Sequence, residues 1–327
     1  MKVNTKPLSK FFVKSAIALA ILFFLPLVAG AQIQITLKDS FIEKFKDRAT
    51  VDTTFTVDKA HKKANPASKD GDLHVAGRAP KEVGLAIVAE IMNARDEDTA
   101  VQAIHAAEQT HQPVKLSGAW RIWCEHGGES KQIQGATLAP FDTTNPDHVF
   151  EIHPIVSLDG KSVADSLKPI VGFTTKDAEQ AFTSYENKKC QIIPNGAKKT
   201  TTIVTSMGGF NYVEFRIKLH SAPFQVADGM MVFATVMRLR DPADQPGSEN
   251  EEDDAVLVRN RLMVFVKGTA PEARVKDLKK DDVLHVLGIP RISLKLVSVR
   301  KQKAKTTPGI LTWNLPYEML IVGVYDN

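Results

Sequence analysis

The two halves of the chain show the same succession of secondary-structure patterns, and this repeat restricts the fold more than any other feature. In each half, three β patterns precede a helical pattern and two further β patterns follow it. The patterns cover 53–58, 73–76, 85–92, 96–110 (helical), 114–124 and 149–158, and then 212–219, 230–239, 262–267, 271–280 (helical), 283–287 and 319–325. Five strands with one helix between the third and the fourth is the chain order of the OB-fold, a small barrel. We therefore predict a mostly β protein with short helices and two tandem small OB-like barrels, with a pair of β-sandwiches as the alternative.

Residue spacing supports these assignments. The segment 212–219 (YVEFRIKL) alternates apolar and charged residues, as a half-buried strand does. Residues 96–110 carry acids at their start and apolar residues on one side, which favours a helix. Further apolar spacing predicts a helix at 175–188, and a short alternating segment at 32–37 precedes helical spacing around 41–45.

The chain is expected to divide near residue 160, into a first domain (32–160) and a second domain (161–327). The first carries a net charge of −5 and seven of the nine histidines, whereas the second carries +5. The overall charge of +4 comes from four lysines in residues 1–31, so the remaining chain is neutral. A neutral chain argues against a uniformly basic nucleic-acid coat.

Residues 1–31 have the three parts of a secretory signal peptide. Lysines precede an apolar run at 16–28 (AIALAILFFLPLV), and Ala29-Gly30-Ala31 forms a small-residue cleavage motif. The run is shorter than the roughly 20 residues of a spanning helix, and no later stretch of the sequence is long enough. We therefore predict cleavage after Ala31, a mature chain without a membrane span, and a periplasmic or extracellular location. Export would permit a disulfide between Cys124 and Cys190, although two distant buried thiols can equally stay free.

Four segments of the first half carry a resemblance to a known family. They are DGDLH (70–74), VAEIMN (88–93), LSGAWRIWCEH (116–126) and HVFEIHP (148–154). In this order they resemble an uncharacterised family of bacterial secreted modules, whose strands carry Asp-x-His, Ala-Glu, Gly-aromatic-His and Glu-Leu-His-Pro motifs. The resemblance covers only residues 70–154, and Ile152 stands where that family has Leu. It implies a secreted domain and no particular activity.

The same segments supply a set of polar residues that could form a site. The candidates are Asp72, His74, Glu90, His126, Glu151 and His153. If they converge, imidazole and carboxylate groups could bind a divalent metal such as zinc, or act as an acid–base pair. The alternative is a buried hydrogen-bond network that connects barrel strands. Their spacing follows no established zinc pattern, and the chain lacks the GxSxG, Walker A and GxGxxG motifs.

The second half separates its charges sharply. The loop 241–254 holds seven acids and no base, and without it this half carries a net charge of +12. A basic OB barrel with aromatic side chains can bind single-stranded nucleic acid or an anionic glycan. The anion-binding candidates are Arg216, Arg238, Arg240, Arg259, Arg261 and Arg291.

These observations predict an exported binding or interaction protein of the cell envelope or extracellular space. Its ligand would be anionic: a glycan, a nucleic acid or a protein. The alternative function is a secreted metal-dependent hydrolase or nuclease that uses the His and Glu residues of the first domain.

Overall fold

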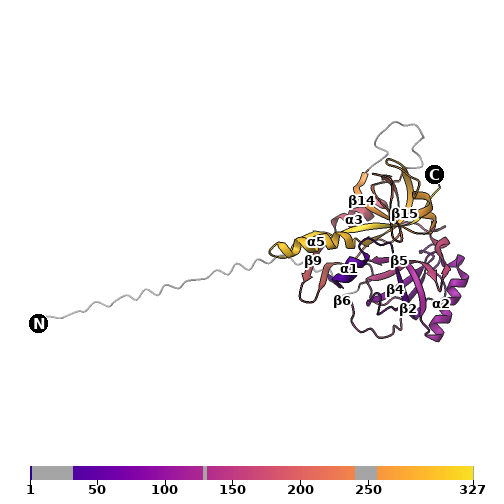
Figure 1. The fold of residues 1–327 in the computed structure, drawn as a ribbon, viewed down its shortest axis with the longest axis horizontal. Helices are drawn as coiled ribbons and strands as arrows, with labels where there is room; N and C mark the ends of the chain where they lie inside the picture. The colour runs from indigo at the N-terminus through magenta and orange to yellow at the C-terminus, as the bar shows by residue number, and fades with distance from the viewer. Residues whose placement is uncertain (2–31, 128–130, 240–255, 327) are drawn as a thin grey trace.

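A computed structural model describes residues 1, 32–127, 131–239 and 256–326. The predictions made for residues 2–31, for Arg240 and for the acidic loop 241–254 lie outside these residues. The described chain forms two barrels and a third sheet, with helix α5 (Leu294–Thr306) projecting to one side (Figure 1).

The first barrel contains five strands that close on themselves. They are β2 (Thr50–Ala60), β3 (Leu73–Arg78), β4 (Ala86–Ile91), β5 (Val114–Ile122) and β7 (Phe150–Leu158). Neighbouring strands pair antiparallel except β4 and β7, which run parallel and close the barrel. Helix α2 (Asp98–Thr110) lies between the third and fourth strands in the chain, as the OB order requires, after a short 3-10 turn (Ala94–Asp96). The short strand β8 (Lys161–Ser162) and a second 3-10 turn (Ala164–Ser166) lead out of this barrel.

The second barrel repeats this topology. Its strands are β11 (Val213–Leu219), β13 (Gly229–Met237), β14 (Val256–Val266), β15 (Val283–Ile292) and β17 (Tyr317–Val324), with β12 (Phe224–Val226) added beside β13. Strands β14 and β17 form the parallel pair, and helix α4 (Ala270–Val275) lies between the third and fourth strands in the chain. The prediction of two tandem OB-like barrels is therefore confirmed, and the structure does not form two β-sandwiches.

The third sheet combines segments from the whole length of the chain. Its strands are, in spatial order, β16 (Thr312–Asn314), β9 (Lys189–Asn195), β10 (Thr200–Ser206), β1 (Gln32–Lys38) and β6 (Lys131–Ile133). The inner residues of β1, such as Ile33 and Ile35, are fully buried. Helix α1 (Asp39–Phe45) follows β1 directly and contacts α5, which packs along β9 (Figure 1). Helix α3 (Ala178–Asn187) precedes β9 and packs on β11 and β14.

A shared apolar layer joins the two barrels. Met92 and Ala119 of the first barrel pack in one buried cluster with Val264, Leu287 and other residues of the second. Because these side chains are withdrawn from water, separating the barrels would expose a continuous apolar surface. The two barrels therefore form one packed unit.

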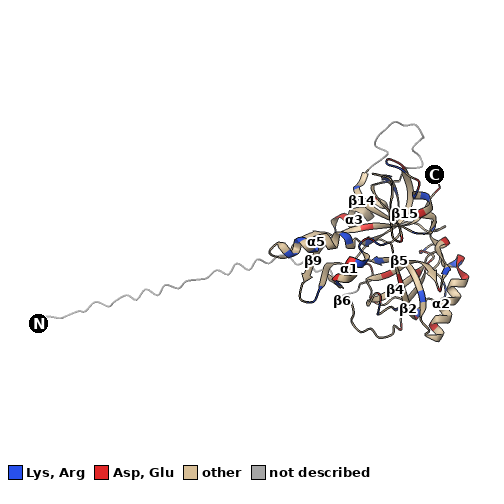
Figure 2. Ribbon diagram, in the orientation of Figure 1, with Lys and Arg blue, Asp and Glu red and all other residues tan. Residues whose placement is uncertain are grey.

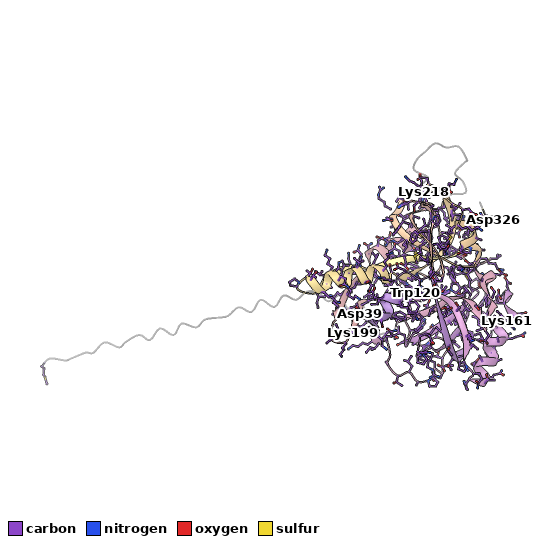
Figure 3. The ribbon with its side chains drawn as sticks, viewed as in Figure 1. Asp39, Trp120, Lys161, Lys199, Lys218 and Asp326 are labelled. Atoms are coloured by element: carbon purple, nitrogen blue, oxygen red, sulfur yellow. The ribbon has the colours of Figure 1, made fainter. Side chains whose placement is uncertain are left out.

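One arginine crosses this layer. Arg291 of β15 is fully buried, and its Nε donates a 2.7 Å hydrogen bond to Glu318. Its other guanidinium nitrogens donate to the carbonyl oxygens of Arg48, Ala49 and Trp120 at 2.9–3.1 Å. The guanidinium carbon also lies 3.7 Å from the centre of the Trp120 ring, which occupies the middle of the molecule (Figure 3). Arg291 thus ties the second barrel to the backbone of the first.

Among the described residues, no helix has the length and apolar character needed to cross a membrane.

Candidate functional site: a buried His and Glu network between the barrels

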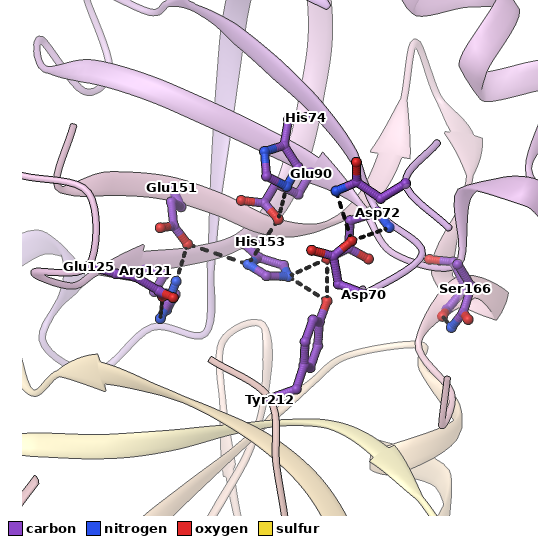
Figure 4. A network of polar contacts seen from close by, with 12 residues as sticks. Asp70, Asp72, His74, Glu90, Arg121, Glu125, Glu151, His153, Ser166 and Tyr212 are labelled. Atoms are coloured by element: carbon purple, nitrogen blue, oxygen red, sulfur yellow. Dashed lines mark hydrogen bonds and ion pairs between the residues drawn. The ribbon is translucent and has the colours of Figure 1, made fainter. Parts of the chain in front are cut away.

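Polar side chains from strands β3, β4, β5 and β7 of the first barrel converge where this barrel faces the second (Figure 4). Alternate residues of a strand point to opposite faces, so Phe150 and Ile152 of β7 fill the barrel while Glu151 and His153 point outward. The pairing of β3 with β4 places His74 opposite Glu90. The outer face of this barrel would normally meet water, but here the second barrel covers its centre.

His153 is the centre of the network. Its Nε2 lies 2.7 Å from the Tyr212 hydroxyl and 3.4 Å from Asp72 Oδ2. Its Nδ1 lies 3.4 Å from a carboxylate oxygen of Glu151 and 3.5 Å from one of Glu90. The Tyr212 hydroxyl donates a 2.7 Å bond to Asp72 Oδ2, so Tyr212 brings the second half of the chain into the network (Figure 4).

The network balances burial against mutual attraction. Burial disfavours a charged His153, but Glu90, Asp72 and Glu151 outweigh it and raise the pKa of His153 well above its usual value. Burial also opposes ionisation of Glu151, yet the neighbouring Arg121 and histidines hold the pKa of Glu151 well below its usual range. For Asp72, burial outweighs the attraction of His153 and raises the pKa of Asp72 to about 7. The centre therefore contains an imidazolium, an ionised Glu151 and a carboxyl group that holds its proton near neutral pH.

Other side chains extend the network toward its edges. Arg121 of β5 pairs with Glu151 and donates a 2.9 Å bond to the Pro290 carbonyl of the second barrel. His74 lies 3.5 Å from Glu90 and retains 15% of its side-chain exposure, so it marks the edge nearest to solvent. The ring of His61 stacks on that of His74, with centroids 4.8 Å apart.

His126 does not reach the centre. The sequence predicted a strand at 114–124, with His126 continuing on the face of Cys124, but the strand ends at Ile122 and the chain bends at 124–126. The His126 ring stacks instead on His148, at a centroid distance of 5.2 Å, and His148 Nε2 lies 3.5 Å from Glu151. Five of the six predicted residues therefore come together. The sixth, His126, is separated from the network by His148.

Three central residues have the ligand types that a metal ion could use. Asp72, Glu90 and His153 each offer a ligand atom, and these atoms lie within 4.8 Å of one another. However, the two ring nitrogens of His153 point to different carboxylates, so the imidazole itself fills the space between Glu90 and Asp72. A metal would have to displace the proton that these carboxylates hold on His153, because a ligating imidazole is neutral. The geometry thus favours a closed hydrogen-bond network over a zinc site, although Asp72 Oδ1 is buried without a hydrogen-bond partner.

The five anion-binding candidates that the structure describes do not form one surface. Arg238 follows β13, Arg259 lies on the paired strand β14, and both are exposed. Arg216 is half-buried on β11. Arg261 lies over the Tyr317 ring, 3.8 Å from its centre, and pairs with Glu186. Arg291 is buried between the barrels and bonded to Glu318, so it cannot contact a ligand at the surface.

Both cysteines are buried free thiols, so the structure does not contain the disulfide that export would permit. The Sγ of Cys190 contacts the Asn314 carbonyl at 3.8 Å, and burial raises the pKa of Cys124 to about 12. An unionised buried thiol behaves as a small apolar side chain.

Sequence reasoning missed a basic surface that only the topology assembles. The third sheet, the β9–β10 turn and α5 together are called the basic arm: residues 32–38, 131–133, 189–206, 294–306 and 312–314. It contains ten Lys and Arg residues and no Asp or Glu: Lys38, Lys131, Lys189, Lys198, Lys199, Lys295, Arg300, Lys301, Lys303 and Lys305. The basic runs at 198–199 and 300–305 were visible in the sequence, but nothing local showed that they share one body. Blue segments along α5 in Figure 2 mark this concentration.

Comparison with protein-family models and with curated proteins finds no match to this sequence. The fold and the geometry therefore carry the functional argument.

Proposed function

We propose that the protein is an exported binding protein that contacts an anionic partner through the basic arm. The observation that carries this proposal is the complete absence of acids from the ten-base arm. Positive charge gathered on the exposed lysines of this arm attracts a polyanion and raises its rate of association. Acids of the neighbouring segment 39–47 pair with Lys295 and Lys301.

Most of the arm's lysines are available at the surface. Eight of its ten bases are exposed, the exceptions being Arg300, which is half-buried, and Lys301, which is buried. Lys301 faces the carboxylates of Glu43 and Asp39 at 3.4 and 3.7 Å, and Lys295 pairs with Asp47 at 2.9 Å. The lysines of the β9–β10 turn, Lys198 and Lys199, lie at the exposed tip of a hairpin.

The usual binding surface of an OB barrel is less accessible in the second barrel. OB-folds commonly bind polymers across their second and third strands. Here these strands are β13 and β14, and their outward residues Met231, Leu262 and Val264 are buried in the layer between the barrels. The part of β13 and β14 that lies outside this layer carries Arg259 and Phe233, which are both exposed. The larger uninterrupted basic surface is the arm.

The exported location rests on the sequence of residues 1–31 and on the resemblance of residues 70–154 to bacterial secreted modules. Both support secretion after cleavage following Ala31. The mass and N-terminal sequence of the exported chain would test this part of the proposal, because cleavage at that site leaves Gln32 as the first residue.

The hydrolase or nuclease hypothesis has no comparable support. Asp72 and His153 are fully buried, and both form a hydrogen bond with the Tyr212 hydroxyl. A substrate therefore cannot contact them in this structure. The network instead joins the two barrels.

Charge reversal tests the binding proposal. In the triple variant Lys198→Glu, Lys199→Glu and Lys303→Glu, we expect affinity for heparin, used as a model polyanion, to fall by on the order of tenfold or more at low salt. The matched control reverses three exposed lysines of a first-barrel loop, Lys62, Lys63 and Lys69, and makes the same change in net charge. Equal losses of affinity in both variants would show that net charge alone causes the effect. If the native protein does not bind heparin, the proposal is refuted.

A further inference from the structure

A shallow, open groove with several polar side chains lies where α3 meets the end of the third sheet. Its volume is about 620 Å³, within the range of small-ligand sites. One wall consists of Gln180, Thr183, Ser184 and Asn187, which are spaced so that they share one face of α3. The opposite wall includes Ser206, the last residue of β10, so the groove adjoins the basic arm.

The α3 wall presents amide and hydroxyl groups that both donate and accept hydrogen bonds. Gln180, Thr183 and Asn187 are exposed, and Ser184 is half-buried. Such a row is suited to ligand hydroxyl groups, which also act as donor and acceptor. No Asp or Glu is among the residues that line the groove.

The opposite wall adds one cation and one aromatic ring. Lys188 Nζ is held by the carbonyl oxygens of Ser206 and Met207 at 3.3 and 3.0 Å, which fixes the ammonium group at the groove. Phe210 is partly exposed, and its ring lies 6.4 Å from that of Tyr185. A fixed cation, a row of hydroxyl-binding groups and an aromatic surface together match a ring with polar edges, an apolar face and a negative substituent.

Nucleic acid fits these surfaces less well. Single-stranded nucleic acid is bound by a series of exposed aromatic side chains on which successive bases stack. Within the basic arm, all of whose residues are described, the only aromatic side chain is Trp313, and it is half-buried with Arg300 near its ring. The remaining outward residues of the sheet include Gln34, Thr36 and Thr202.

We propose that this groove binds a sugar unit of an acidic polysaccharide, whose negative groups continue onto the basic arm. This inference rests on the proposed anion-binding function and names its ligand class. The groove supplies recognition of sugar hydroxyls, and the lysines of the arm supply charge attraction.

The test compares two polyanions on the intact mature protein by titration calorimetry. The probes are a heparin-derived hexasaccharide and inorganic polyphosphate, which has charge but no sugar. In the double variant Gln180→Ala and Asn187→Ala, we expect affinity for the hexasaccharide to fall about tenfold, because two hydrogen bonds to hydroxyls are lost. Affinity for polyphosphate should stay unchanged. The matched control removes two exposed glutamines of α2, Gln102→Ala and Gln109→Ala.

The outcomes separate this inference from the proposed function. If both probes bind alike and the groove variant weakens neither, the saccharide inference is overturned while anion binding by the arm stands. Tighter binding of an oligothymidylate, with no effect of the groove variant, would likewise overturn it in favour of nucleic acid. If none of these polyanions binds, the proposed function fails and this inference fails with it.

Discussion

Asp72 and His153 show how a single covered surface changes the chemistry of its residues. On an open barrel, both side chains would be solvated and would titrate near their usual values. Beneath the second barrel, burial raises the pKa of Asp72 to about 7, and carboxylates on both sides raise the pKa of His153 despite its burial. Both groups bind protons more tightly in the folded protein than in the unfolded chain.

This proton uptake predicts that stability falls as the pH rises. The contribution of Asp72 is lost between its unfolded pKa, near 4, and its folded pKa of about 7, and that of His153 is lost above pH 6.5 as the pH passes its raised folded pKa. Glu151, whose folded pKa is lowered, has the opposite effect and loses its contribution below about pH 4.5. The protein should therefore be most stable at mildly acidic pH.

Asp72→Asn provides the test at this scale, because an amide mimics the protonated carboxyl. As the pH rises from about 5 to about 8, we expect the unfolding free energy of the variant to increase by about 1–3 kcal/mol relative to that of the native protein. Urea denaturation at several pH values measures this difference. The control is Asp52→Asn, at an exposed position of β2. A parallel pH dependence in the Asp72 variant and the native protein would contradict the assignment.

Elements with local signals could be predicted from the sequence, and elements without them could not. The ten barrel strands and the helices α2, α3 and α4 were expected, because alternation or helical spacing marks each one. Predicted bounds differed where a pattern ran on, as at Cys124, where the apolar pattern of β5 continues two residues past the end of the strand at Ile122. For the candidate site, the pairs Asp72/His74 and Glu151/His153 could be chosen because their members lie two positions apart on a strand pattern, and Glu90 because it is a charged residue within an apolar strand pattern. Tyr212 could not, since it comes from the other barrel.

The third sheet and α5 were not predicted, for two physical reasons. Strands β6 and β16 contain only three residues each, too few for alternation to be recognised. Helix α5 buries Lys301 among Leu294 and Val297, so its buried face is not apolar throughout and its sequence resembles a charged loop. Only the contact with α1 explains why that lysine is buried.

Lys301→Ala should loosen α5 while leaving the barrels intact. The buried ammonium faces Glu43 and Asp39 across the contact between α5 and α1, so its removal is expected to cost about 1–3 kcal/mol. Hydrogen exchange should then accelerate in α5 and β9 but not in β4 or β17. Lys303→Ala, which removes an exposed lysine of the same helix, should have little effect. Unchanged exchange in the Lys301 variant would show that the apolar contacts alone hold α5.

At the scale of the whole molecule, we expect the two barrels to unfold as one thermodynamic unit. Interfaces between domains are often polar and allow motion. Here an apolar layer, Arg291 and the His153 network all cross the boundary, so neither barrel can unfold without exposing buried groups of the other.

Arg291→Met tests this coupling. The native protein should unfold in a single urea transition, with coincident curves from tryptophan fluorescence and circular dichroism. The variant leaves Glu318 buried without its cation, and we expect it to lose about 3–5 kcal/mol. The exposed Arg259→Met is the matched control, and it should change stability by less than about 0.5 kcal/mol. Two separate transitions in the native protein would show that the barrels fold independently.

The third sheet also has a consequence for the order in which the chain can fold. Strand β1 is synthesised well before its partner β10, since Gln32 pairs with Ser206, and β9 pairs with the late strand β16. Until the middle of the chain has followed, β1 carries an unpaired edge that could join another molecule. Such long-range closure is slow. A holdase chaperone that covers the first strand would therefore protect newly made chains from aggregation during this delay.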